Sequence, residues 1–191
     1  MRLHPARVSF HWVVPFLLSL LASSSVSAQS TDPILTGLKG VEIAMELQND
    51  TEARLGLTPD RAFSAVEEEL LKAGVSFLPA PAQKMQIGRR VQRMPKNYAL
   101  LFFQVATVAD DKLGGYAVDF SFQLLDRVRL SRDSSKETIA SVYKGRHLVL
   151  MRGRGIADEA ERNLRALARE FAADFKASNP GEVRQPTTPN R

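Results

Sequence analysis

The feature that most constrains the fold of this 191-residue chain is a set of three successive strand patterns, joined by short turns. Residues 98–108 form a continuous apolar run, which is typical of a strand covered on both faces. Residues 116–130 alternate apolar and polar, which predicts a long half-buried strand with a bulge near Leu125-Asp126. Residues 138–151 predict a third strand, bulged or bent at Gly145. Sequential strands with short connections pair antiparallel, so we expect a meander.

Two amphipathic helices flank these strands. Thr58 and Pro59 suit the cap and first position of a helix that ends at Gly74. Residues 158–176 predict a second helix, with acidic residues in its first turn and Lys176 near its end. The expected buried stripes are Ala62, Phe63, Val66, Leu70 and Ala73 in the first helix, and Ala160, Leu164, Leu167, Phe171 and Phe175 in the second.

The remaining segments complete the expected architecture. Residues 41–47 alternate as a strand, residues 75–78 suggest a short strand, and residues 79–97 read as a long loop. We therefore predict a two-layer α+β domain, an antiparallel sheet of about four strands covered by two helices in the order β-α-(β)-β-β-β-α. This single domain spans residues 40–180, between an irregular lead (29–39) and a disordered tail (181–191), and the strand order stays open.

The N-terminus predicts export. Arg2 and Arg7 precede an uncharged apolar run over residues 12–22, and Val26-Ser27-Ala28 offers small residues to a signal peptidase. This apolar run is short for a membrane anchor, which needs about 20 residues. We expect a signal peptide over residues 1–28, cleaved after Ala28, and a protein of the periplasm or the medium without a membrane span.

Composition narrows the chemistry of the mature chain. There is no cysteine, which excludes thiol catalysis, thiolate metal sites and a lipid-bearing cysteine. His147 is the one histidine left after cleavage, and positive charges rather than a carboxylate adjoin it in sequence. Neither a Gly-x-Ser-x-Gly elbow nor a phosphate-binding loop occurs. We therefore predict no catalytic residue, no cofactor and no metal.

A basic segment is the candidate binding surface. It carries five cations and no acid within residues 79–97. Arginine dominates, which suits bidentate contact with carboxylate or phosphate groups. An envelope protein or an anionic envelope ligand is the expected partner; nucleic acid is not, since no aromatic residues interleave the cations. The alternative is a merely solvated surface. The five cations are Lys84, Arg89, Arg90, Arg93 and Lys96, and further arginines that would join them if the fold converged are Arg127, Arg129, Arg132, Arg146, Arg152 and Arg154.

Several strand, cap and core residues together form a recognisable pattern. They are Gly40-Val41, Gly56-Leu57-Thr58, Leu71-Lys72-Ala73-Gly74-Val75, the strand from Tyr116 to Val128-Arg129-Leu130, Ala140-Ser141-Val142-Tyr143, Phe171, Phe175 and Asn179-Pro180. In these residues most of the mature chain resembles uncharacterised bacterial exported proteins. This resemblance implies export and a small α+β fold, and it brings no known catalytic residue.

Three functional hypotheses follow. The first is a non-enzymatic binding or accessory module of the cell envelope, working through a sheet face or the basic segment. The second is an envelope-acting enzyme that uses carboxylates such as Asp119 and Glu137, which a retaining glycosidase would hold ~5 Å apart. The third is a structural subunit that pairs strands through an exposed edge of the meander. The oligomeric state is not predicted.

Overall fold

The computed structural model describes residues 32–48, 50–79, 85–110, 112 and 114–181. The predicted signal peptide, Lys84 and nearly all of the predicted tail lie outside the described residues. The chain forms a four-stranded sheet in the order β1-β2-β3-β4, with β1 at Gly40–Gln48, β2 at Tyr98–Asp110, β3 at Gly115–Leu130 and β4 at Asp133–Met151.

The predicted α+β class is confirmed, and the sheet is mixed. β2, β3 and β4 form the expected antiparallel meander, whereas β1 pairs parallel with β2, from Gly40 beside Tyr98 to Gln48 beside Ala106. The parallel pair arises because the chain crosses over the sheet between β1 and β2, so that both strands run in the same direction. A register shift at Leu124/Leu125 lies where a bulge was predicted.

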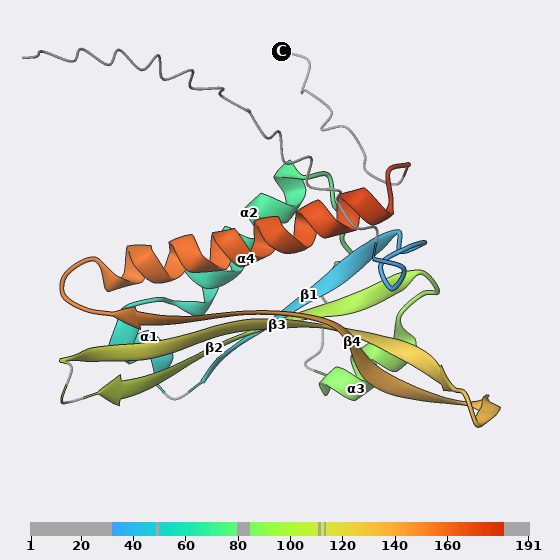
Figure 1. Ribbon diagram of the computed structural model, residues 1–191, viewed down its shortest axis with the longest axis horizontal. Coiled ribbons are helices and arrows are strands. Elements are labelled where there is room, and N and C mark those ends of the chain that lie inside the picture. The colour runs from blue at the N-terminus through green and yellow to red at the C-terminus, as the bar shows by residue number, and fades with distance from the viewer. Residues whose placement is uncertain (1–31, 49, 80–84, 111, 113, 182–191) are drawn as a thin grey trace, which may run out of the picture.

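Helices lie on both faces of the sheet (Figure 1). α2 (Pro59–Lys72) and α4 (Ile156–Ser178) cover one face, and the short α1 (Thr51–Leu55) follows β1. α3 (Ile87–Arg93) packs against the opposite face, within the stretch predicted to be a loop. It forms because Val91 and Met94 are buried against Leu100 and Phe102, a tertiary contact that proline-rich composition does not reveal.

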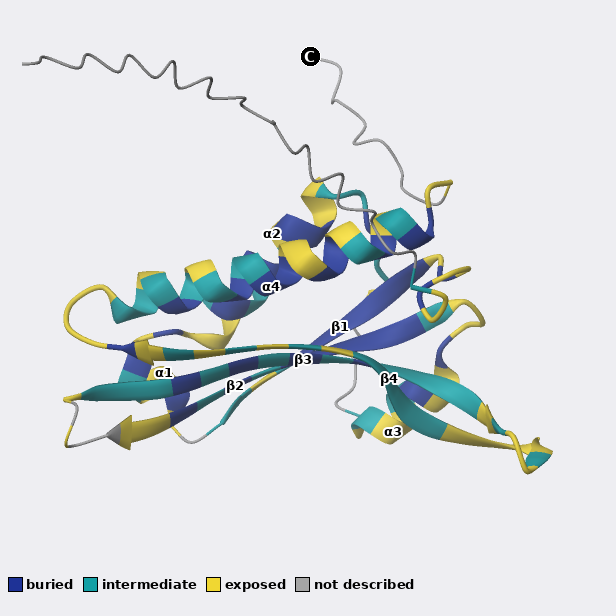
Figure 2. Ribbon diagram, in the orientation of Figure 1, coloured by how far each residue is buried: buried dark blue, intermediate teal, exposed yellow. Residues whose placement is uncertain are grey.

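The main core lies between the sheet and the pair α2 and α4 (Figure 2). Phe122 is its centre, 5.4 Å from Phe103, 5.7 Å from Tyr143 and 5.7 Å from Phe171 between ring centroids. Rings at these separations add to the free energy gained by burying their area. The two predicted helical stripes supply most of the helix side of this core.

Local caps set the helix bounds as the sequence suggested. The Thr58 hydroxyl accepts a hydrogen bond from the Arg61 N–H, and Pro59 is the first helical residue. Gly74 takes a left-handed φ of 80° after α2, where its N–H bonds the Leu71 carbonyl. No helix among the described residues is both long and apolar enough to cross a bilayer.

Candidate functional site

A large hollow follows the outer edge of β1. It measures about 890 Å³ and lies between β1, α1 and the start of α2. A second hollow of about 430 Å³ shares Ile43 and Phe63 with the first and continues toward Phe77 and Pro79. We call the two together the β1 groove. Large concave sites of this kind are the default position for a binding site.

The wall of the β1 groove is the unpaired edge of a strand. Val41 already uses its outward main-chain groups, because its N–H bonds the Ser76 carbonyl and its carbonyl accepts from the Leu78 N–H. In a parallel strand both main-chain groups of a residue point to one side and alternate along the chain. Ile43, Met45 and Leu47 therefore point their main-chain groups outward, as Val41 does.

Among the described residues, which leave out 80–84, this edge is paired only at the bridge between Val41 and Phe77, which replaces the predicted strand over residues 75–78. The Ile43 carbonyl accepts from the Arg90 guanidinium at 3.1 Å. Within the part of the chain that the structure describes, no hydrogen bond reaches the outward N–H and C=O of Met45. Burial also falls along β1, from buried residues up to Ala44 to half-buried or exposed ones from Met45 onward (Figure 2).

An apolar surface lines the groove beside this edge. Phe63 on α2 contributes to both hollows and is only half-buried, although the helical stripe counts it among the core residues. Ile43, Met45 and Leu47 lie on the same side of the sheet. A side chain that enters from outside would therefore meet apolar area at the level of Phe63.

Four carboxylates border the groove, and we call them the acidic rim. Asp50 and Glu52 lie at the β1–α1 junction, Asp60 in the first turn of α2, and Glu67 farther along α2. Within the described ranges, none of the four carboxylates has a hydrogen-bond or ion-pair partner.

At the α1 end of the groove, buried hydrogen bonds connect α1 to the sheet. The Thr51 side chain is buried, and its hydroxyl bonds the carbonyls of Gln48 and, at 3.2 Å, Val105. Asp50 precedes it with a left-handed φ of 54°, which is uncommon for a residue other than glycine. These contacts tie α1 to the sheet and fix the position of Asp50 and Glu52, the two rim residues at the β1–α1 junction.

The structure divides the predicted basic surface. Arg90 is largely enclosed, and its Nε donates to the Glu42 carboxylate at 2.6 Å, so its charge is matched within the fold. Arg89, Arg93 and Lys96 are exposed around α3, where Arg93 contacts the Met85 sulfur. Binding of an anionic partner by these exposed cations stays a prediction.

The other arginines do not all gather there. Arg127 does join α3, because its guanidinium donates to the Met94 carbonyl at 3.1 Å. Arg146 instead pairs with Asp119 at 2.7 Å, and Arg129 with Glu137. Arg152 and Arg154 follow β4, at the end of the sheet opposite the β3–β4 hairpin (Figure 1).

The structure also places the other residues considered for chemistry. Asp119 and Glu137 are ten positions apart along the β3–β4 ladder, since Glu137 pairs with Arg129. Ten residues of strand span about 33 Å, so these two carboxylates cannot act on one glycosidic bond. His147 has a carboxylate partner after all, Glu170 on α4 at 3.0 Å, which adjacency in sequence could not show.

The outer edge of the meander is β4. Its exposed side chains include Leu148 and Leu150, and Val108 of β2 is exposed on the same sheet face. This face lies opposite α2 and α4, beyond the area that α3 covers. Strand pairing through β4 stays a prediction, because no described contact indicates what would cover it.

Comparisons with known proteins give a weak structural likeness. No protein-family model and no curated protein matches the chain. A PelC dodecamer from Paraburkholderia phytofirmans is 19% identical over 82% of this chain and 96% of that chain, with a TM-score of 0.42. A point variant of the same dodecamer is 17% identical over 73% and 92%, with a TM-score of 0.41. Likeness at this level supports no statement about function.

Proposed function

We propose that this protein is an exported binding module that holds an extended segment of a partner polypeptide in the β1 groove. It works in the periplasm or the medium after cleavage behind Ala28. The observation that carries the proposal is the outer edge of β1, which lines a large hollow and, among the described residues, is paired only at Val41.

Strand addition explains why such an edge would bind a polypeptide. A guest strand gains main-chain hydrogen bonds from the host edge, and its alternate side chains reach the surfaces on either side of the sheet. Here one set of side chains would meet Phe63 and its apolar neighbours. The bridge between Val41 and Phe77 shows that the same edge already accepts an extended segment at one end.

The elongated shape of the groove favours a polypeptide over a compact ligand. The two hollows share Ile43 and Phe63 and run from the Phe77–Pro79 end to α1. Among the described residues no group of three or more histidine, cysteine or acidic side chains is arranged to hold a metal ion. The groups of the groove best suited to bind a ligand are therefore the outward main-chain N–H and C=O groups of β1.

A proline in the edge tests the proposal. Met45→Pro removes an N–H that points outward, so we expect the β1–β2 pairing to survive and the binding of a guest strand to weaken at least about tenfold. The probe is a short neutral peptide in which valine and threonine alternate, and its affinity is measured by calorimetry. Met45→Ala controls for loss of the partly buried side chain.

A second proline variant shows that the effect belongs to the edge. The N–H of Glu46 points toward β2, so Glu46→Pro should instead destabilise the sheet by about 3 kcal/mol or more. Unchanged binding of the neutral peptide by folded Met45→Pro would refute strand addition at β1.

A further inference from the structure

Most of the charged side chains around the β1 groove are negative. Within the described part of the chain, its four rim carboxylates face one lining cation, Arg90; the four are Asp50, Glu52, Asp60 and Glu67. Arg90 does not offset them, because it is already engaged by Glu42. The local excess is therefore negative, although the whole chain carries a net charge of +5.

The acidic run on α2 is split between two tasks. Glu68 and Glu69 turn toward α4, where Arg165 binds them at 2.8 and 3.2 Å. Glu67, the neighbour of Glu68, lines the groove instead. Helical geometry separates adjacent residues by about 100°, so one acidic run can serve both surfaces. The ion pairs with α4 explain why Glu68 and Glu69 are acidic, but they do not explain the acidic residue at position 67.

The rim carboxylates are spread along the groove. Glu67 lines the hollow toward Phe77, while Asp60, Glu52 and Asp50 line the hollow toward α1. An extended guest points every second side chain to the same face, with a repeat of about 6.6 Å. Several side chains of one guest would thus come within reach of a carboxylate.

From this complementarity we infer that the segment bound in the β1 groove belongs to a partner polypeptide and alternates apolar residues with lysine or arginine. This inference rests on the proposed strand addition. The cations of such a segment face α2, where their charged ends pair with the rim, and the apolar positions face the other side of the sheet. Long aliphatic stems of lysine and arginine cover Phe63, because they pack on apolar surface while their charged ends stay in water.

Three matched peptides test the inference with the full chain. Valine alternates with lysine in the first, with threonine in the second and with glutamate in the third. At about 50 mM salt we expect the lysine peptide to bind about tenfold more tightly than the threonine peptide, and the glutamate peptide to bind most weakly. The preference should shrink at about 500 mM salt, because exposed charges are screened.

Charge-neutralising variants test whether the acidic rim causes the preference for the lysine peptide. The double variant Asp60→Asn and Glu67→Gln should lose about fivefold or more in affinity for the lysine peptide and keep its affinity for the threonine peptide. Glu137→Gln with Glu170→Gln makes the same charge change away from the groove and should change neither affinity.

The outcomes separate the inference from the proposed function. Equal binding of all three peptides would overturn the charge preference and leave strand addition standing. Binding of none would overturn both. A concentration-dependent mass of the protein alone, abolished by Asp60→Asn with Glu67→Gln, would instead make the occupant a second copy of this chain and overturn the assignment to a partner.

Discussion

At position 145 of β4, the neighbouring ring of Phe122 requires a residue without a Cβ, which is glycine. A Cβ at this position would lie 2.2 Å from Cε1 of Phe122, its cross-strand partner, which real side chains do not tolerate. The glycine thus leaves space for the ring at the centre of the aromatic core. The sequence predicted a bulge or bend here, whereas the strand remains paired and the requirement is steric.

Replacement of two glycines by alanine should change the stability of the protein in opposite directions. Gly145→Ala is expected to destabilise the protein by about 1–3 kcal/mol, because the Phe122 ring must move in a packed core. Gly88→Ala in α3 should stabilise it by about 0.5–1 kcal/mol, since alanine favours helix and its Cβ would meet Ile139 at an ordinary 3.7 Å. Urea unfolding of both variants measures these changes; a loss of stability at Gly88 equal to that at Gly145 would contradict the steric argument.

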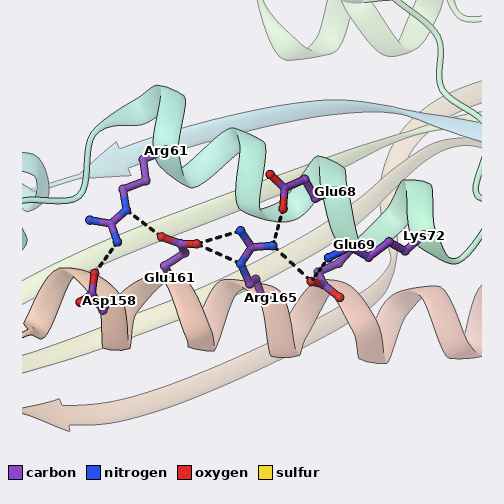
Figure 3. Close-up of polar contacts among 7 residues, drawn as sticks. All are labelled: Arg61, Glu68, Glu69, Lys72, Asp158, Glu161 and Arg165. Carbon is purple, nitrogen blue, oxygen red and sulfur yellow. Dashed lines mark hydrogen bonds and ion pairs between the residues drawn. The ribbon is translucent and has the colours of Figure 1, made fainter.

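At the scale of elements, ion pairs join α2 to α4 (Figure 3). Arg165 bonds Glu161 on its own helix and reaches Glu68 and Glu69 on α2, while Arg61 of α2 reaches Glu161 at 2.7 Å. Arg165 and Glu69 are mostly shielded from solvent, with side-chain exposures of 23% and 10%. Because these groups are partly buried, removal of one partner costs more than at a surface ion pair, since it leaves a shielded charge unpaired.

This network also sets a pH dependence. Hydrogen bonds from Arg165 and Arg61 lower the pKa of Glu161. For Glu69, burial by itself raises the pKa, and the bonds from Lys72 and Arg165 outweigh it, so the net pKa is lowered. A carboxylate with a lowered native pKa stabilises the fold above its ordinary pKa of about 4.5, and this contribution is lost as the pH falls below that value.

Arg165→Met tests the network. We expect a loss of about 1–3 kcal/mol in the free energy of unfolding at pH 7, because Glu69 and Glu161 lose their shared cation. The fall in stability below about pH 4.5 should become shallower in the variant, since both pKa values return toward the ordinary one. Urea titrations across pH, with the exposed Arg162→Met as control, measure this; parallel pH profiles for wild type and Arg165→Met would argue against it.

At the scale of the whole molecule, the two ends of the domain are joined. Asn179, which is 4% exposed, follows α4 and donates to the Leu35 carbonyl at 2.7 Å, while its side-chain oxygen accepts from the Gly37 N–H at 2.7 Å. Ser178 accepts from the Asp32 N–H. The segment before β1 is thereby fastened to the end of the last helix.

Asn179→Ala should open this junction. The loss leaves the Gly37 N–H without its partner, and the buried Leu35 carbonyl keeps only its 3.3 Å bond from the Leu38 N–H. We expect this to cost about 1–3 kcal/mol and to lower Tm by about 2–12 °C. Asn163→Ala is the control, because Asn163 makes one bond within α4 and alanine favours helix. Calorimetry with hydrogen exchange at Gly37 measures both effects; unchanged exchange at Gly37 would refute the role of Asn179.

The sequence alone determined those parts of the fold that depend on local periodicity and local caps. Alternation located β1 and β3, the apolar run located β2, and Thr58, Pro59 and Gly74 bounded α2. These signals work because a strand or helix exposes its sides with a fixed repeat, so that burial leaves a matching pattern in neighbouring residues. The short helix α3 was not predicted from the sequence, because its pattern spans only seven residues.

Only the tertiary structure decided where the proposed binding surface lies. Arg90 was counted among five candidate contacts, yet Glu42, 48 residues away, engages it. Phe63 matched the core stripe; it packs against the main core and also lines the groove. Among the described residues, β1 pairs in parallel with β2 on one side, and its other edge carries only the bridge to Phe77. Such features depend on which distant segments become neighbours, and local periodicity carries no information about that choice.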